Sequence, residues 1–132
     1  MLHTHGKKVQ FDWSLVGNSL TIKNEHGRTH KYQLDEILSI IKWLHAEFGA
    51  GWFPLANNVQ KLGNATEKPG LGIAILNQSP DDIEHAQGSS YLGVILDYCG
   101  IFKWNGKRRG IKWRIMKDNI TKENLRGWLT TK

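Results

Sequence analysis

The sequence contains a single cysteine, Cys99, and only three prolines among its 132 residues. One cysteine cannot form a disulfide within the chain, so we expect a reducing compartment, the cytoplasm. No apolar run approaches the roughly 18 residues of a membrane span, and we therefore expect no membrane segment. Residues 1–8 lack the apolar core of a signal peptide, so we expect no secretion signal.

A recognisable catalytic set is also missing. The six histidines are scattered along the chain, without an HExxH motif or a cysteine pair for zinc. We expect His3 and His5 to belong to a flexible tail. His26, Arg28 and His30 alternate along a predicted strand, a pattern that suits phosphate binding but is more typical of a solvated strand face. The sequence therefore predicts a protein that is not an enzyme and needs no metal or cofactor.

What the sequence does contain is a very uneven distribution of charge. The formal net charge is +6, but the segment 103–117 alone carries +7 without any aspartate or glutamate, which leaves the rest of the chain at −1. Its basic residues are Lys103, Lys107, Arg108, Arg109, Lys112, Arg114 and Lys117. A concentration of this kind indicates a polyanionic partner better than it indicates a solvated face.

The first third of the chain predicts strands. Apolar and polar residues alternate over residues 9–13 and 20–22, which is the period of a strand with one buried face. Turn signals at Gly17-Asn18 and at residues 25–27 separate these segments. We expect a small antiparallel meander over residues 8–33.

The middle of the chain predicts short helices around one short strand. Apolar residues recur at three- and four-residue steps over residues 35–48, which predicts an amphipathic helix. Pro54 cannot donate to an inner ladder, so residues 52–55 are expected to form an edge strand. A short helix over 56–62 and a loop over 64–70 follow. Residues 71–76 are apolar and short, so periodicity does not distinguish a helix turn from a buried strand, and we expect a helix.

The last part predicts a long helical segment and then a hairpin. Ser79 as N-cap, Pro80 at the first position and an acidic first turn predict a helix over residues 80–99. Gly88 either divides it into two helices or lies in one helix with a close neighbour. Asn105-Gly106 is a strong turn signal between the alternating segments 101–104 and 110–116, which predicts an antiparallel hairpin with a basic tip. Residues 121–129 predict a short helix capped by Thr121.

The segments 89–102 and 104–114, a helix leading through Gly100 into a basic hairpin, resemble the recognition helix and wing of the winged helix-turn-helix superfamily. The order of elements over residues 35–116 extends this resemblance. It implies an α+β fold, a winged helix-turn-helix core preceded by a small N-terminal antiparallel β-meander. The expected division is a meander appendage at 1–33, a winged-helix domain at 34–117 and a C-terminal short helix or tail at 118–132.

The resemblance implies a nucleic-acid-binding protein, with double-stranded DNA as the expected partner and a role as transcriptional regulator or accessory factor. The wing is expected to contact phosphates through Lys103, Lys107, Arg108, Arg109, Lys112 and Arg114. The leading end of a recognition helix is expected at Gln87, Ser89, Ser90 and Tyr91.

Two alternatives stay open at the level of the sequence. The charge pattern does not distinguish DNA from RNA. The second alternative is a protein–protein interaction or oligomerisation module of the same fold without a nucleic-acid role, in which an exposed edge of the N-terminal strands pairs with a second copy to form a homodimer.

Overall fold

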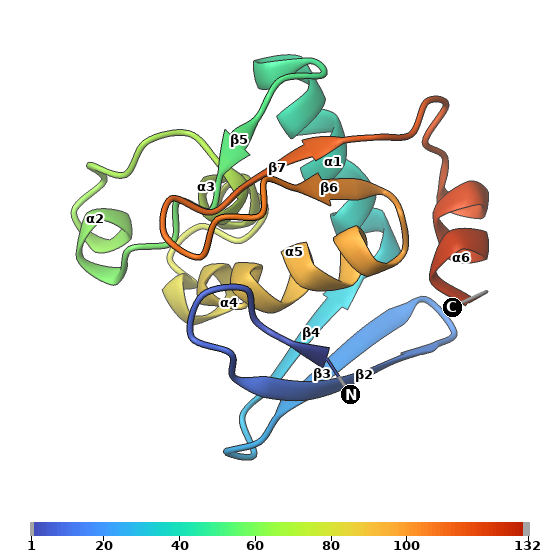
Figure 1. The fold of residues 1–132 in the computed structure, drawn as a ribbon, viewed down its shortest axis with the longest axis horizontal. Helices are drawn as coiled ribbons and strands as arrows, with labels where there is room; N and C mark the ends of the chain where they lie inside the picture. The colour runs from blue at the N-terminus through green and yellow to red at the C-terminus, as the bar shows by residue number, and fades with distance from the viewer. Residues whose placement is uncertain (1, 131–132) are drawn as a thin grey trace.

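Two small antiparallel sheets lie on either side of a layer of helices in the computed structural model, which describes residues 2–130 (Figure 1). The first sheet has the order β1-β2-β3-β4 and the second has the order β5-β7-β6. The strands are β1 (Leu2–His3), β2 (Gln10–Val16), β3 (Ser19–Asn24), β4 (Thr29–Gln33), β5 (Phe53–Pro54), β6 (Phe102–Trp104) and β7 (Lys112–Ile115). The helices are α1 (Leu34–Phe48), α2 (Val59–Gly63), α3 (Leu71–Gln78), α4 (Ile83–Gln87), α5 (Ser89–Tyr98) and α6 (Lys122–Thr130).

The predicted meander is confirmed, and one further strand extends it. Strands β2, β3 and β4 pair in sequence order, with Val16 opposite Ser19 across the two-residue turn at Gly17-Asn18. The added strand β1 pairs only with Gln10 and Phe11 at the start of β2. The structure thus confirms an α+β fold with a four-stranded antiparallel N-terminal sheet.

The basic hairpin is also confirmed. Strands β6 and β7 pair antiparallel with Trp104 opposite Trp113, and β5 adds to the other side of β7 as the expected edge strand. The helices over 35–48 and 71–76 and the capped C-terminal helix form as well; the Asn124 amide donates to Thr121 Oγ1 at 3.1 Å. In the part of the chain that the structure describes, no helix is long and apolar enough to cross a membrane.

The predicted start of the helix at Ser79 and Pro80 is wrong. Ser79 instead ends α3, since its amide donates to the carbonyl oxygens of Ile75 and Leu76 at 3.2 and 3.1 Å. The true N-cap is Asp82, whose Oδ1 accepts the His85 amide at 3.0 Å. Because α3 extends to Gln78, the preceding carbonyl groups capture Ser79 before a new helix can begin.

The short helix after β5 begins later than predicted. Ala56 adopts a positive φ of 50°, which lies outside the helical region, so α2 cannot begin there. Asn58 is the actual N-cap, because its Oδ1 accepts the Lys61 amide at 3.1 Å. The loop over 64–70 follows as expected.

The sequence left two alternatives for Gly88, a break between two helices or a close neighbour packed against the glycine, and the structure shows both features. Gly88 separates α4 from α5, and a Cβ atom there would collide with the Tyr32 hydroxyl and lie 3.0 Å from His30 Nδ1. Gly93 lies inside α5, where the indole of Trp113 packs directly against its backbone. Both glycines therefore allow a sheet side chain to approach a helix closely.

One hydrophobic core joins the two sheets and the helices between them. It includes Phe11 and Tyr32 of the meander, Leu44 of α1, Leu92 of α5 and Trp113 of the hairpin, all buried. Helix α5 lies at the centre, and seven of its ten residues are buried. The division of the chain into an appendage and a winged-helix domain remains a prediction, as does membership of the winged-helix superfamily.

The expectation that His3 and His5 belong to a flexible tail is wrong. His3 pairs with Gln10 in the first sheet. His5 is buried and stacks on Trp104, with ring centroids 3.9 Å apart and planes 2° apart. Residues 2–9 therefore form an ordered segment that connects the meander to the basic hairpin.

Candidate nucleic-acid interface

A groove of about 1020 Å³ opens where the N-terminal segment, the turn between β3 and β4, the hairpin tip and the start of α5 meet. We call it the basic groove. Its walls are formed by residues of all four segments and of the loop after β5: Thr4, His5, Gly6, Lys7, Val9, Asn24, His26, Arg28, His30, Leu55, Asn57, Asn58, Val59, Gln87, Ser90, Tyr91, Arg108, Arg109, Ile111 and Trp113.

The charge of the basic groove has one sign. Lys7, Arg28, Arg108 and Arg109 line it together with three histidines, and no aspartate or glutamate occurs among the described lining residues. Cationic side chains gathered on low-dielectric walls focus the field and raise the local concentration of anions. The groove is therefore built to attract an anionic ligand.

The turn between β3 and β4 presents Arg28 and His26 to the groove. Asn24 organises this turn, because its Oδ1 accepts the amides of His26 and Arg28 at 3.0 and 2.9 Å. Gly27 completes the turn with a φ of 82°, a conformation that glycine adopts without strain. The position of the Arg28 side chain thus depends on a turn that hydrogen bonds hold in place.

Tyr91 joins this turn to helix α5. Asn24 Nδ2 donates to the Tyr91 hydroxyl at 3.0 Å, and the Tyr91 ring meets Phe11 edge to face at 5.1 Å. The hydroxyl oxygen accepts the hydrogen bond from Asn24, so the hydroxyl hydrogen is still available to donate. None of the described residues accepts it. Tyr91 can therefore donate to an anion in the groove.

The hairpin tip forms the opposite wall. Asn105 fixes the tip, because its side chain donates to the Gly110 carbonyl and accepts the Lys107 amide, each at 3.1 Å. Arg108 extends from the tip to the N-terminal segment, where its Nη2 donates to the Gly6 carbonyl at 3.1 Å. This contact closes one side of the groove and orients the Arg108 guanidinium across it.

Two buried nitrogen atoms in the wall form no hydrogen bond with the described residues, although His5 Nε2 lies 3.8 Å from Asp97 Oδ2. Trp113 Nε1 and His5 Nε2 belong to side chains that are 1% and 8% exposed, and neither atom forms a hydrogen bond within the described chain. A buried polar group without a partner costs about 1–3 kcal/mol. Burial lowers the pKa of His5 to about 4, so the ring is neutral at pH 7.

Three further charges of the hairpin lie on its other face. Because Lys103 is opposite Arg114 and both alternate with buried neighbours, they point away from the core, as does Lys112. Arg114 lies over the Trp52 ring, 5.4 Å from its centroid. Lys103, Lys112 and Arg114 form what we call the outer face, which is separate from the basic groove.

The structure brings together five of the ten predicted contact residues in the basic groove: Gln87, Ser90, Tyr91, Arg108 and Arg109. Three more form the outer face, and Lys107 is exposed at the hairpin tip. Ser89 is fully buried, with an exposure of 0%, so the prediction that it contacts a ligand is wrong. Helix α5 is central in the fold, and its first residue packs inward rather than leading the helix into solvent.

Lys7 and Asn24 were not predicted from the sequence, and His26, Arg28 and His30 were not placed at a groove. The preferred interpretation of a solvated strand face is wrong for His30, which is buried and faces Tyr91 with ring centroids 5.4 Å apart. His26 and Arg28 lie in the turn between β3 and β4, and only His30 lies on β4, so a common strand face does not place them together. The fold brings all three to the groove that the hairpin tip also lines.

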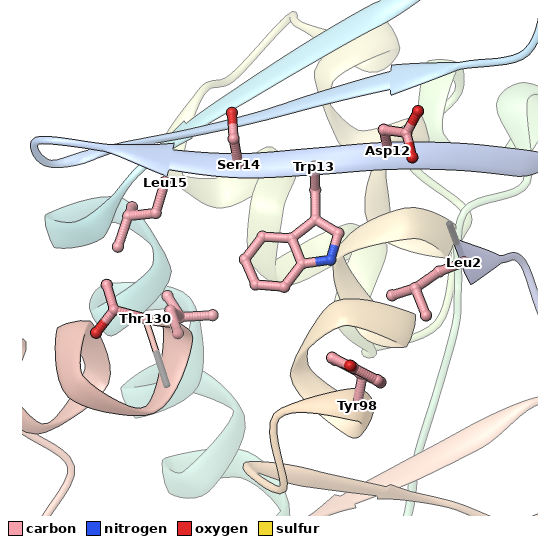
Figure 2. Close-up of a pocket in the computed structure, with 8 residues that line it drawn as sticks. Leu2, Asp12, Trp13, Ser14, Leu15, Tyr98 and Thr130 are labelled. Carbon is pink, nitrogen blue, oxygen red and sulfur yellow. The ribbon is translucent and has the colours of Figure 1, made fainter. Parts of the chain in front are cut away.

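A second hollow, of about 380 Å³, has a different character (Figure 2). Trp13 and Leu15 point from β2 toward the ends of α5 and α6, where Tyr98 and Thr130 lie, while Asp12 and Ser14 point from the other face of the strand. None of the described residues that line this hollow is basic. It therefore offers no attraction for a polyanion.

Comparison with known proteins identifies no relative. No family model, no curated protein and no solved structure matches the chain.

Because the pKa of His5 is lowered in the folded protein, we expect the stability of the protein to depend on pH. Its pKa is lower in the folded protein than the usual 6.5, so protons bind the unfolded chain preferentially, and the free energy of unfolding falls as the pH drops from 6.5 to 4. One pKa unit corresponds to about 1.4 kcal/mol, so we expect His5 to account for a loss of about 2–3 kcal/mol between pH 7 and 4.5. Urea unfolding at both pH values, compared between the wild type and His5→Gln, measures this.

The comparison uses the change with pH, because His5→Gln also removes the stack on Trp104 and lowers stability at every pH. His45→Gln, which replaces an exposed histidine of α1, is the matched control and should keep the wild-type dependence. An unchanged pH dependence in His5→Gln would contradict the prediction.

Proposed function

We propose that the chain is a nucleic-acid-binding protein that holds the phosphate backbone in the basic groove. The observation that carries this proposal is the groove itself, lined by four lysines and arginines from distant parts of the sequence and by no described carboxylate. Phosphate contacts from such side chains release counterions and supply most of the affinity for a polynucleotide. The outer face adds three further cations on the same hairpin.

The polar residues of the groove support recognition beyond charge. Gln87 and Ser90 lie at the junction of α4 and α5, and Asn57 and Asn58 line the wall across from the meander. Amide and hydroxyl side chains donate to and accept from base edges, whereas lysine and arginine on phosphates carry no sequence information. A role as regulator or accessory factor is part of this proposal.

Binding of fluorescently labelled oligonucleotides, followed by anisotropy over a range of salt concentrations, tests the function. We expect measurable binding at 50 mM salt and a plot of log K against log salt with a slope of roughly −3 to −4, from about 0.9 per neutralised phosphate and four groove cations. Absence of binding to every duplex and single strand at 50 mM salt, or an affinity independent of salt, would refute the proposal.

The second candidate is association through the N-terminal sheet, and one observation favours it. Strand β1 covers only Gln10 and Phe11, so on the β1 side no described strand pairs with β2 beyond Phe11. In an antiparallel pair, residues whose peptide groups hydrogen-bond to the partner strand alternate with residues whose peptide groups point the other way. Val16 and Ser14 belong to the first kind toward β3, so the peptide groups of Trp13 and Leu15 point to the β1 side. A homodimer through this edge remains a prediction.

A further inference from the structure

We propose that the basic groove receives a single-stranded segment of nucleic acid rather than the surface of a duplex. This inference rests on the nucleic-acid-binding function proposed above and specifies the form of the ligand. It follows from the shape of the site, from the burial of α5 and from the chemistry of the walls.

The shape of the fold favours a single strand. Protein elements read duplex DNA by entering a major groove about 12 Å wide, which requires a helix or ribbon that projects from the protein. Helix α5 does not project, because Ser89 is fully buried and Tyr91 is only 9% exposed at its first turn. The helix lies between the two sheets, in the middle of the fold (Figure 1). The residues expected to read bases are thus at the floor of a hollow.

The size and partial enclosure of the hollow also favour a single strand. Its volume of about 1020 Å³ lies at the upper end of the roughly 300–1,000 Å³ of small-molecule sites, so it accommodates a few nucleotides but not a double helix. The contact between Arg108 and the Gly6 carbonyl closes one side, and the turn held by Asn24 borders another. A single strand can enter such a channel, whereas a duplex meets only its rim.

The walls of the groove combine cationic and apolar side chains. Single-strand sites combine cations that follow the backbone with apolar or aromatic surfaces on which bases rest. Here Leu55, Val59 and Ile111 contribute apolar surface beside the arginines, and Val59 is 52% exposed. The phosphates of a duplex would make no favourable contact with this apolar wall, whereas unpaired bases can pack on it.

The experiment compares matched oligonucleotides with two variants of the full chain. The probes are a 12-nucleotide oligo-dT, a 12-nucleotide oligo-U and a 12-base-pair duplex, all measured by anisotropy at 100 mM salt. The variants are Arg28→Ala in the basic groove and Lys42→Ala on α1, outside both the groove and the outer face; each removes one charge from an exposed side chain. Circular dichroism and thermal unfolding establish that both variants fold as the wild type does.

We expect one of the single strands to bind at least tenfold more tightly than the duplex. We also expect Arg28→Ala to weaken single-strand binding roughly fivefold to tenfold, because one phosphate contact contributes about 0.7 to the slope of log K against log salt. The same variant should change duplex binding less than twofold. Lys42→Ala should leave single-strand binding unchanged. The two single strands differ in the 2′-hydroxyl, so their comparison assigns the site to DNA or RNA.

A duplex that binds as tightly as the single strands, or an Arg28→Ala variant that weakens both forms equally, would overturn this inference and leave the proposed function standing. No binding of any probe would overturn the function itself. The two failures are therefore distinguishable in one experiment.

Discussion

Replacing Arg108 and Arg109 together with alanine is expected to weaken nucleic-acid binding by roughly 10- to 100-fold at 0.1 M salt. Each phosphate contact contributes about 0.7–0.9 to the slope of log K against log salt, which amounts to a factor of five to ten per contact at this concentration. Both side chains line the basic groove from the hairpin tip. Anisotropy with the tightest-binding oligonucleotide measures the loss, and the slope should become shallower by about 1.5–2.

The charge-matched control is Lys31→Ala with Lys42→Ala. Both lysines are exposed and lie outside the groove and the outer face, on β4 and α1. If the effect of the arginines came only from the net charge, this pair would weaken binding equally. Equal losses in the two double variants, or no loss in Arg108→Ala with Arg109→Ala, would show that the hairpin tip has no specific role.

Gly93→Ala is expected to lower the free energy of unfolding by about 2 kcal/mol, although alanine is the better helix former. A Cβ atom at this position would lie 2.6 Å from Trp113 Cη2 and 2.8 Å from Cε2, well inside van der Waals contact. Trp113 is buried and paired in the sheet, so its ring cannot move aside. Overpacking of this kind costs about 1–3 kcal/mol or more, which exceeds the gain of about 1 kcal/mol in helix propensity.

Thermal unfolding provides the measurement, with an expected decrease in Tm of roughly 10 °C. Gly127→Ala in α6 is the matched control, because a Cβ atom there meets no other atom within 4 Å. That variant should be as stable as the wild type or more stable by up to about 1 kcal/mol. A stable Gly93→Ala would mean that α5 and β7 are not packed as closely as the structure has them.

Periodicity and turn chemistry predicted most of the elements of this fold. The two-residue turns, the amphipathic helix α1 and the hairpin with its tryptophans all carry local signals that depend on few residues. The start of α4 was misplaced because Ser79 is equally suited to beginning one helix and to ending another, and only the length of α3 decides between them. A local capping signal cannot include that information.

The groove was harder to predict because its walls come from distant parts of the sequence. The basic residues of the hairpin tip formed a dense local signal, so Arg108 and Arg109 were found. Lys7 and Arg28 are isolated cations in their own segments, and only the packing of the meander against the hairpin brings them close. Ser89 was wrongly included because a helix start predicted from sequence carries no information about which side of it is buried.

The Arg108 contact to Gly6 joins positions 102 residues apart in the sequence. Together with the stack of His5 on Trp104, it makes the groove a product of both ends of the chain. Binding is therefore thermodynamically linked to global folding: a ligand at one hundred times its Kd adds about 2.7 kcal/mol to the stability of the folded state, provided that the unfolded chain does not bind it. Occupancy and conformational stability rise together, and the free protein is the form most exposed to unfolding.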